Sequence, residues 1–157
     1  EIWPRDWSSD VCSSDLLSQF LKGSTSGELN VLRNLPNYHY VEAPTTTCKF
    51  VFQMDDQEKM EYSQQVRQHF ADTVEAVKKY HAKLLVMDEV LDAVAMGMLS
   101  DEALAEFLRN RPEDLEVVMT GRAPTPCTDP LADYITRMQK VRHPFDKGLN
   151  ARLGVEF

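Results

Sequence analysis

The chain has 157 residues, 43% of them hydrophobic, and its 17 Lys and Arg against 25 Asp and Glu give a formal net charge of −8. This length and composition predict one globular domain with a sizeable core and argue against disorder. The acidic balance argues against a nucleic-acid binder, because such a protein needs a basic surface. No apolar run approaches the roughly 20 residues that span a bilayer. We therefore expect neither nucleic acid nor a membrane as a partner.

Cysteine usage and the start of the chain give two further expectations. The three cysteines are widely spaced and form neither a disulfide framework nor a zinc motif, which indicates a reducing cytoplasm. Residues 1–16 lack any helical or strand period, contain Ser-Ser-Asp twice, and do not have the pattern of a signal peptide. Much of this segment resembles a translated sequencing adapter. We expect 1–16 to be a non-native segment outside the fold, with a genuine disordered tail as the alternative, and 17–157 to be the domain.

Short apolar runs alternate with helical patterns along the rest of the chain. Asp55 or Asp56 opens a long helix, since Asp55 and Glu58 have the spacing of a capping box. Ser100 caps another helix. Strands are predicted at residues 17–21, 38–41, 84–87 and 115–119, and a last strand is expected to start at 135–138. Strands that alternate with helices predict an α/β fold with a parallel sheet and helices on both faces.

Polar groups follow three of these strands, namely Lys22-Gly23, Asp88-Glu89 and Thr120-Gly121-Arg122. In open parallel sheets ligands bind beyond the carboxyl ends of the strands, so this convergence indicates a site. An apolar strand followed by two acids is similar to a Walker B motif, whose carboxylate holds Mg²⁺ beside nucleotide phosphates. The alternative is a solvated cap acid. Arg122 is suited to a phosphate, or else it is a surface residue in an ordinary turn.

Two other segments leave their roles open. The aromatic pair Phe50 and Phe52 fits simple core packing, with a ligand-facing loop as the alternative. His143 stands in a turn-rich stretch near the end of the chain, and a lone histidine is more often structural than catalytic. The remaining histidines have no metal-ligand spacing.

Taken together, these segments resemble one known family. In chain order they are Gln19-Phe20-Leu21-Lys22-Gly23, Gly27-Glu28, Phe50-Val51-Phe52-Gln53, Val86-Met87-Asp88-Glu89, Thr120-Gly121-Arg122, Ala132-Asp133, His143-Pro144-Phe145-Asp146-Lys147-Gly148 and Gly154-Val155-Glu156-Phe157. This order and spacing closely resemble the P-loop type of corrinoid adenosyltransferase over residues 17–157. The resemblance implies a three-layer RecA-like P-loop fold with a mostly parallel sheet, and a homodimer.

The resemblance also implies an activity. Such an enzyme transfers the 5′-deoxyadenosyl group of ATP to the Co(I) of a reduced corrinoid and releases triphosphate, in adenosylcobalamin biosynthesis or salvage. Mg²⁺ or Mn²⁺ would assist, and a reduced flavoprotein would donate electrons. By the same resemblance the corrinoid would meet Phe50 and Phe52 as an apolar wedge, ATP would meet Lys22, Glu28, Arg122 and His143, and the metal would lie near Glu89 and Asp88.

The sequence departs from the family pattern in three ways. It contains no Gly-x-x-x-x-Gly-Lys-Ser/Thr, so the resemblance implies that the first strand, the phosphate loop and the first helix are missing and that this chain is inactive. Phe52 stands where many members carry Trp. Three prolines between Arg122 and Leu131 disfavour a helix there, so we expect a loop or one short turn. The rival interpretations are another RecA-like ATPase, which would release phosphate, and a non-enzymatic corrinoid-binding domain.

Overall fold

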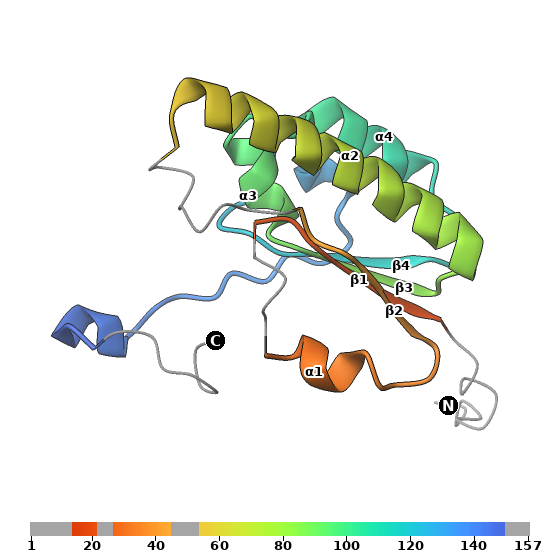
Figure 1. Cartoon of the computed structure of the whole chain (residues 1–157), viewed down its shortest axis with the longest axis horizontal. Helices are drawn as coiled ribbons and strands as arrows, with labels where there is room; N and C mark the ends of the chain where they lie inside the picture. The colour runs from red at the N-terminus through yellow and green to blue at the C-terminus, as the bar shows by residue number, and fades with distance from the viewer. Residues whose placement is uncertain (1–13, 22–26, 45–53, 150–157) are drawn as a thin grey trace.

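The computed structural model describes residues 14–21, 27–44 and 54–149, which contain a four-stranded, all-parallel sheet (Figure 1). The strand order is β2-β1-β3-β4. The strands are β1 (Asp15–Gln19), β2 (Tyr38–Val41), β3 (Leu84–Asp88) and β4 (Glu116–Met119). The α/β fold with a parallel sheet is therefore confirmed. Parallel order also brings the carboxyl ends of all four strands to one edge of the sheet.

The central strand β1 begins earlier than expected. It starts at Asp15 rather than at residue 17, and Leu16 is only 1% exposed. Leu16 pairs with His39 on one side and with Leu85 on the other. Pairing on both sides and burial of an apolar side chain both favour extending the strand, so the boundary expected after residue 16 is wrong by two residues. Residues 1–13, which form most of that segment, lie outside the described residues.

Helices cover the sheet on both sides (Figure 1). The short α1 (Leu29–Leu32) lies on one face, and α2 (Asp56–Tyr80), α3 (Val90–Ala95) and α4 (Asp101–Arg109) lie on the other. The predicted capping box at the start of α2 is present. Asp55 Oδ1 accepts from the Glu58 amide at 2.8 Å, and Glu58 Oε2 accepts from the Asp55 amide at 3.0 Å. Neither α1 nor α3 was predicted, because each is too short to show a helical period.

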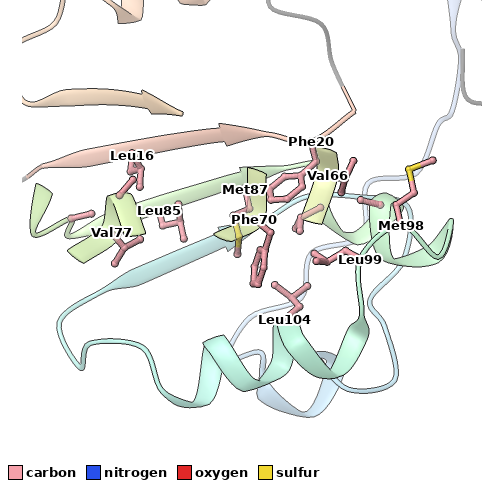
Figure 2. Packing of buried hydrophobic residues seen from close by; sticks show 14 of the residues in the cluster. Leu16, Phe20, Val66, Phe70, Val77, Leu85, Met87, Met98, Leu99 and Leu104 are labelled. Carbon is pink, nitrogen blue, oxygen red and sulfur yellow. The ribbon is translucent and has the colours of Figure 1, made fainter. Parts of the chain in front are cut away.

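The core fills the space between the sheet and the larger helical layer. Figure 2 shows Met87 of β3, and Phe20 directly after β1, packed against α2 and α4. On α2, Val66, Phe70 and Val77 are buried, and Val74 is partly buried against the same cluster, so these residues form one apolar stripe along the helix. Burial of this apolar area is the main force that holds the helices on the sheet. No helix in the described residues is long and apolar enough to cross a membrane.

The chain after β4 differs from the expectation. The proline-rich stretch forms only the 3₁₀ turn η3 (Asp129–Leu131), as predicted, and Asp101 of α4 anchors the preceding loop by accepting from the Cys127 amide at 3.0 Å. The strand expected to start at 135–138 is absent, and residues 132–149 are exposed. A strand needs a hydrogen-bonded neighbour. This segment runs away from the sheet toward the 3₁₀ turn η4 (Pro144–Lys147), so it has none among the described strands (Figure 1).

Candidate active site

The ends of three neighbouring strands meet at Asp88, the last residue of β3. Gln19 ends β1, and its Nε2 donates to Asp88 Oδ2 at 3.3 Å. Thr120 follows β4, and its hydroxyl donates to Asp88 Oδ1 at 2.7 Å. Each carboxylate oxygen therefore accepts a hydrogen bond from a different strand end. These bonds fix the orientation of the Asp88 side chain at the carboxyl edge of the sheet, where ligands of parallel sheets bind.

The backbone at Glu89 adopts an unusual conformation. Its φ is +61° and its ψ is +17°, in the left-handed region, which costs a residue other than glycine about 1–2 kcal/mol. The Glu89 amide donates to the Thr120 hydroxyl at 2.8 Å, so the same threonine holds both acids of the Asp-Glu pair. Backbone strain of this kind persists where surrounding contacts hold it, and it concentrates at functional sites.

A second carboxylate joins this cluster from the other side of β1. Gln19 Nε2 also donates to Glu28 Oε1 at 3.0 Å, so one amide group bridges Glu28 and Asp88. Glu28 lies just before α1 and is exposed, whereas Asp88 is half-buried. Neither acid was predicted to contact Gln19. Gln19 therefore links Glu28, which the family resemblance assigns to ATP, with Asp88, which it assigns to the metal.

The long helix α2 also contacts this edge. The Tyr62 hydroxyl donates to the Phe20 carbonyl at 3.1 Å, directly after the end of β1. Tyr62 is 4% exposed, and burial, with a smaller effect from the charge of Glu89, raises its pKa to about 12. The phenol is therefore a permanent donor at neutral pH. It ties the end of β1 to the helical layer.

The turn after β4 brings Arg122 to the same side of the sheet. The Arg122 amide donates to Asp92 Oδ1 at 3.1 Å, and the side chain is exposed. Gly121 makes this close approach possible, since a Cβ added there would lie 2.6 Å from Leu91 Cβ. The turn is thus packed directly on the first turn of α3, beside Glu89.

The remaining predicted residues are not brought together here. His143 is exposed at the start of η4, where its Nδ1 accepts from the Phe145 amide at 3.1 Å, and Figure 1 shows η4 set apart from the sheet. Lys22, Phe50 and Phe52 lie outside the described residues. A groove of about 470 Å³ between α2 and α4 is lined by none of the predicted site residues.

The strand ends offer oxygen donors but no ready-made metal cage. Within the described ranges, no group of three or more His, Cys, Asp or Glu side chains could by itself hold a metal ion. Asp88, Glu89 and Glu28 are nevertheless carboxylates, and Mg²⁺ prefers oxygen ligands and keeps several waters while sharing one or two carboxylates with substrate phosphates. The donor set therefore fits Mg²⁺ held together with a nucleotide, rather than by the protein alone.

Sequence reasoning missed Gln19 and Tyr62 as members of this cluster, and it treated Thr120 only as part of a turn. Gln19 carried a signal that could have been used. It stands beside Ser18 between apolar residues on both sides, and the structure buries it to 1% exposure at the end of the central strand. Tyr62 carried no such signal, because a tyrosine on the apolar face of a helix is compatible with ordinary core packing.

A parallel α/β sheet with acids, an amide and a hydroxyl grouped beyond its carboxyl edge is the arrangement of an enzyme that binds its ligand there. The family model for ATP:corrinoid adenosyltransferase BtuR/CobO/CobP matches residues 12–157. The chain therefore belongs to the corrinoid adenosyltransferase family, a family of transferases. Its four-stranded parallel sheet is consistent with the RecA-like fold of that family.

Individual relatives agree with this assignment. A corrinoid adenosyltransferase of Pseudomonas aeruginosa is 32% identical over 151 residues, covering 88% of this chain and 67% of the relative. The corrinoid adenosyltransferase of Escherichia coli strain K12 is 28% identical over 145 residues, covering 88% of this chain and 68% of the relative. Corrinoid adenosyltransferase CobA of Salmonella typhimurium is 29% identical over 145 residues, covering 88% of this chain and 68% of the relative.

Proposed function

We propose that the site at the strand ends is the nucleotide and metal side of an ATP:corrinoid adenosyltransferase. The reaction would transfer the 5′-deoxyadenosyl group of ATP to the Co(I) of a reduced corrinoid and release triphosphate, in adenosylcobalamin biosynthesis or salvage. The observation that carries the proposal is the cluster at Asp88, where side chains from three adjacent strand ends converge. Family membership favours this reaction over the chemistry of another RecA-like ATPase or a binding-only domain.

The acids of this cluster would bind Mg²⁺, or Mn²⁺ in its place. Asp88 and Glu89 are the proposed holders, with Glu28 beside them through Gln19. The ion, when bound, supplies positive charge to the phosphates of ATP. Thr120 would keep both acids in position, since its hydroxyl donates to the Asp88 carboxylate and accepts from the Glu89 amide.

The other side chains would orient the substrates. Arg122 would donate to a phosphate, for which a guanidinium is geometrically suited. Lys22, Glu28 and His143 are proposed ATP contacts by family resemblance. Because cobalt and ATP carry the difficult chemistry, the contribution of the protein would be to place C5′ against the cobalt and to exclude water.

Phe50 and Phe52 are proposed corrinoid contacts, again by resemblance. A lower axial ligand makes cobalt harder to reduce, because it donates into the orbital that accepts the incoming electron. Two apolar rings below the corrin plane would displace that ligand and so ease formation of Co(I). A reduced flavoprotein in the cytoplasm is the proposed electron donor, and a homodimer is the proposed assembly.

The decisive experiment is incubation with ATP and chemically reduced corrinoid, following the absorption spectrum of the adenosylated product. Two versions of the protein should be compared, the 157-residue chain and one preceded by a segment that carries Gly-x-x-x-x-Gly-Lys-Thr. Adenosylation by the second version, lost in Asp88→Asn and retained in Asp114→Asn, would support the proposal. Asp114 is a suitable control because it is an exposed aspartate before β4, paired with Lys83. Release of inorganic phosphate without any corrinoid product would favour an ATPase instead.

A further inference from the structure

Gln19 has an unusual combination of burial and unequal hydrogen bonding. Its side chain is buried at the end of the central strand, and its Nε2 donates to two carboxylates, Glu28 at 3.0 Å and Asp88 at 3.3 Å. Its Oε1 is buried and has no hydrogen-bond partner among the described residues. Buried polar atoms are nearly always paired, so an unpaired one at a ligand-binding edge requires an explanation.

The orientation of the amide group follows from its neighbours. An amide nitrogen has two hydrogens, and both are used by the carboxylates of Glu28 and Asp88. Rotating the amide by half a turn would place Oε1 against two acceptor oxygens and leave no donor between them. The carboxylates therefore determine which end of the amide is the nitrogen. The Gln19 Oε1 atom then has no described donor to accept a hydrogen bond from.

A purely structural role does not account for this arrangement. Ser18, the preceding residue on β1, is also buried, yet its hydroxyl is fully engaged with His69 at 2.8 Å and Thr73 at 2.7 Å. The core thus provides hydrogen-bond partners for the Ser18 hydroxyl on one side of β1, but none for the Gln19 side-chain oxygen on the other. Two other described side chains have a buried unpaired oxygen, namely Ser14, just before the start of β1, and Tyr40 on the edge strand β2.

We propose that Gln19 is a positioning residue of the adenosyltransferase site with two linked tasks. Its amide nitrogen holds Glu28 and Asp88 side by side, and its Oε1 accepts a hydrogen bond from an O–H group of the bound metal–nucleotide complex. This inference rests on the proposed function, because it assumes that the site binds such a complex. The O–H group has two sources, a water on the metal ion or a ribose hydroxyl of ATP.

The test is made in the version of the protein that carries the added phosphate-loop segment. It compares Gln19→Met with Gln64→Met, which makes the same chemical change at an exposed position of α2. Gln19→Glu is a third variant, which keeps an acceptor oxygen but removes the bridging donor. Mn²⁺ serves as the metal probe, read by electron paramagnetic resonance at millimolar concentrations, and ATP, 2′-deoxyATP and 3′-deoxyATP serve as nucleotides. We expect Gln19→Met to weaken binding of Mn²⁺·ATP by about 10-fold to 100-fold, the range found when outer partners of metal ligands are removed. Gln64→Met should bind as the wild type does.

The nucleotide series distinguishes the two sources of the O–H group. If a metal-bound water is the donor, Gln19→Met weakens free Mn²⁺ as well, and by the same factor for all three nucleotides. If a ribose hydroxyl is the donor, Gln19→Met weakens Mn²⁺·ATP more than free Mn²⁺, and this additional loss disappears with one of the deoxynucleotides. Gln19→Glu should bind Mn²⁺·ATP less well than the wild type, because it removes the donor that holds the two acids.

Equal binding by Gln19→Met and the wild type would overturn the inference. Should Gln19→Met fail to fold, the side-chain carbonyl of Gln19 can be followed by ¹³C NMR in the wild type, where an unchanged signal at saturating MgATP would overturn it equally. A protein that binds Mn²⁺·ATP through Gln19 but never adenosylates a corrinoid would contradict the proposed function alone. A loop-bearing protein with Gln19 intact that binds neither Mn²⁺ nor nucleotide would contradict both.

Discussion

Ser18 of β1 and His69 of α2 are joined by a 2.8 Å hydrogen bond inside the core. The Ser18 hydroxyl also contacts the Thr73 hydroxyl at 2.7 Å, and Thr73 donates to the His69 carbonyl at 2.8 Å. His69 is 3% exposed, and its ring and the Phe20 ring form a T-shaped contact with centroids 4.9 Å apart. This polar chain therefore connects the central strand to the long helix without access to water.

The first prediction concerns the pH dependence of stability. Burial lowers the pKa of His69 to about 4, against smaller opposing effects of Asp72 and the Glu42 carbonyl. The unfolded chain takes up a proton near pH 6.5, where the folded chain does not, so stability falls as the pH drops from about 6.5 to about 4. The loss from this one group is about 3 kcal/mol. Urea unfolding of the wild type and His69→Gln across this range should show a shallower pH dependence in the variant, and parallel curves would contradict the prediction.

The second prediction concerns the turn after β4. Gly121→Ala places a Cβ 2.6 Å from Leu91 Cβ, so the turn and α3 must separate. We expect a loss of about 1–3 kcal/mol, typical of overpacking. Gly97→Ala is the matched control, because Gly97 also has a positive φ, +72°, but nothing lies within 4 Å of its added Cβ. Thermal and urea unfolding should show a larger loss for Gly121→Ala, and equal losses would remove the steric explanation.

The third prediction concerns the start of α2. Asp55→Ala removes the side chain that accepts from the Glu58 amide at 2.8 Å. Loss of such a cap costs about 0.5–2 kcal/mol. Ser63→Ala, in the interior of the same helix, removes a hydroxyl that bonds only to the Lys59 carbonyl and should be nearly neutral. Urea unfolding at neutral pH measures the free energy of unfolding of both variants. If Asp55→Ala were as stable as the wild type, packing alone would determine where the helix begins.

The fourth prediction concerns ATP. The 157 residues contain no phosphate-loop sequence, which would surround phosphates with backbone N–H groups at a helix N-terminus. The acids and Arg122 cannot replace that set of donors, so calorimetry should find MgATP binding in the millimolar range or weaker and no adenosylation. Addition of a loop-bearing segment should strengthen binding. Micromolar binding by the chain as it stands would disprove this expectation.

The fifth prediction concerns the corrinoid. In a loop-bearing protein, Phe52→Ala should slow adenosylation when Co(II) corrinoid must first be reduced, because the lower ligand is no longer displaced. The Phe52→Ala substitution should slow adenosylation less when Co(I) corrinoid is supplied directly. Equal losses in both assays, together with a large drop in melting temperature, would show that Phe52 serves core packing.

Elements with a strong local signal were predictable from the sequence. The runs at 84–87 and 115–119 were recognised as strands because apolar residues followed by polar ones mark buried parallel strands, and the structure has strands at Leu84–Asp88 and Glu116–Met119. The second is less buried than expected, because β4 lies at the edge of the sheet. Asp55 was recognised from cap spacing alone. The segment 135–138 was also expected to start a strand yet forms none, since strand formation depends on a neighbour that local composition does not specify.

The site was predictable only in part. Asp88 ends β3 and Thr120 follows the adjacent parallel strand β4, so their proximity could be expected from the topology. The bridge from Gln19 to Glu28 and Asp88 did not, because it depends on the side-chain conformation at the last residue of β1. The left-handed backbone of Glu89 was equally hidden, since glutamate carries no preference for that conformation.

The pairing of the central strand has a consequence for how this chain folds. β1 joins β3 through partners such as Gln19 and Asp88, which are 69 residues apart in the sequence. Loop closure over that distance costs entropy before any strand hydrogen bond forms, whereas α2 can form from contacts between near neighbours. Refolding is therefore expected to be limited by the meeting of β1 and β3. During synthesis, β1 can pair with β2 early, but β3 cannot join them until the ribosome has passed residue 88.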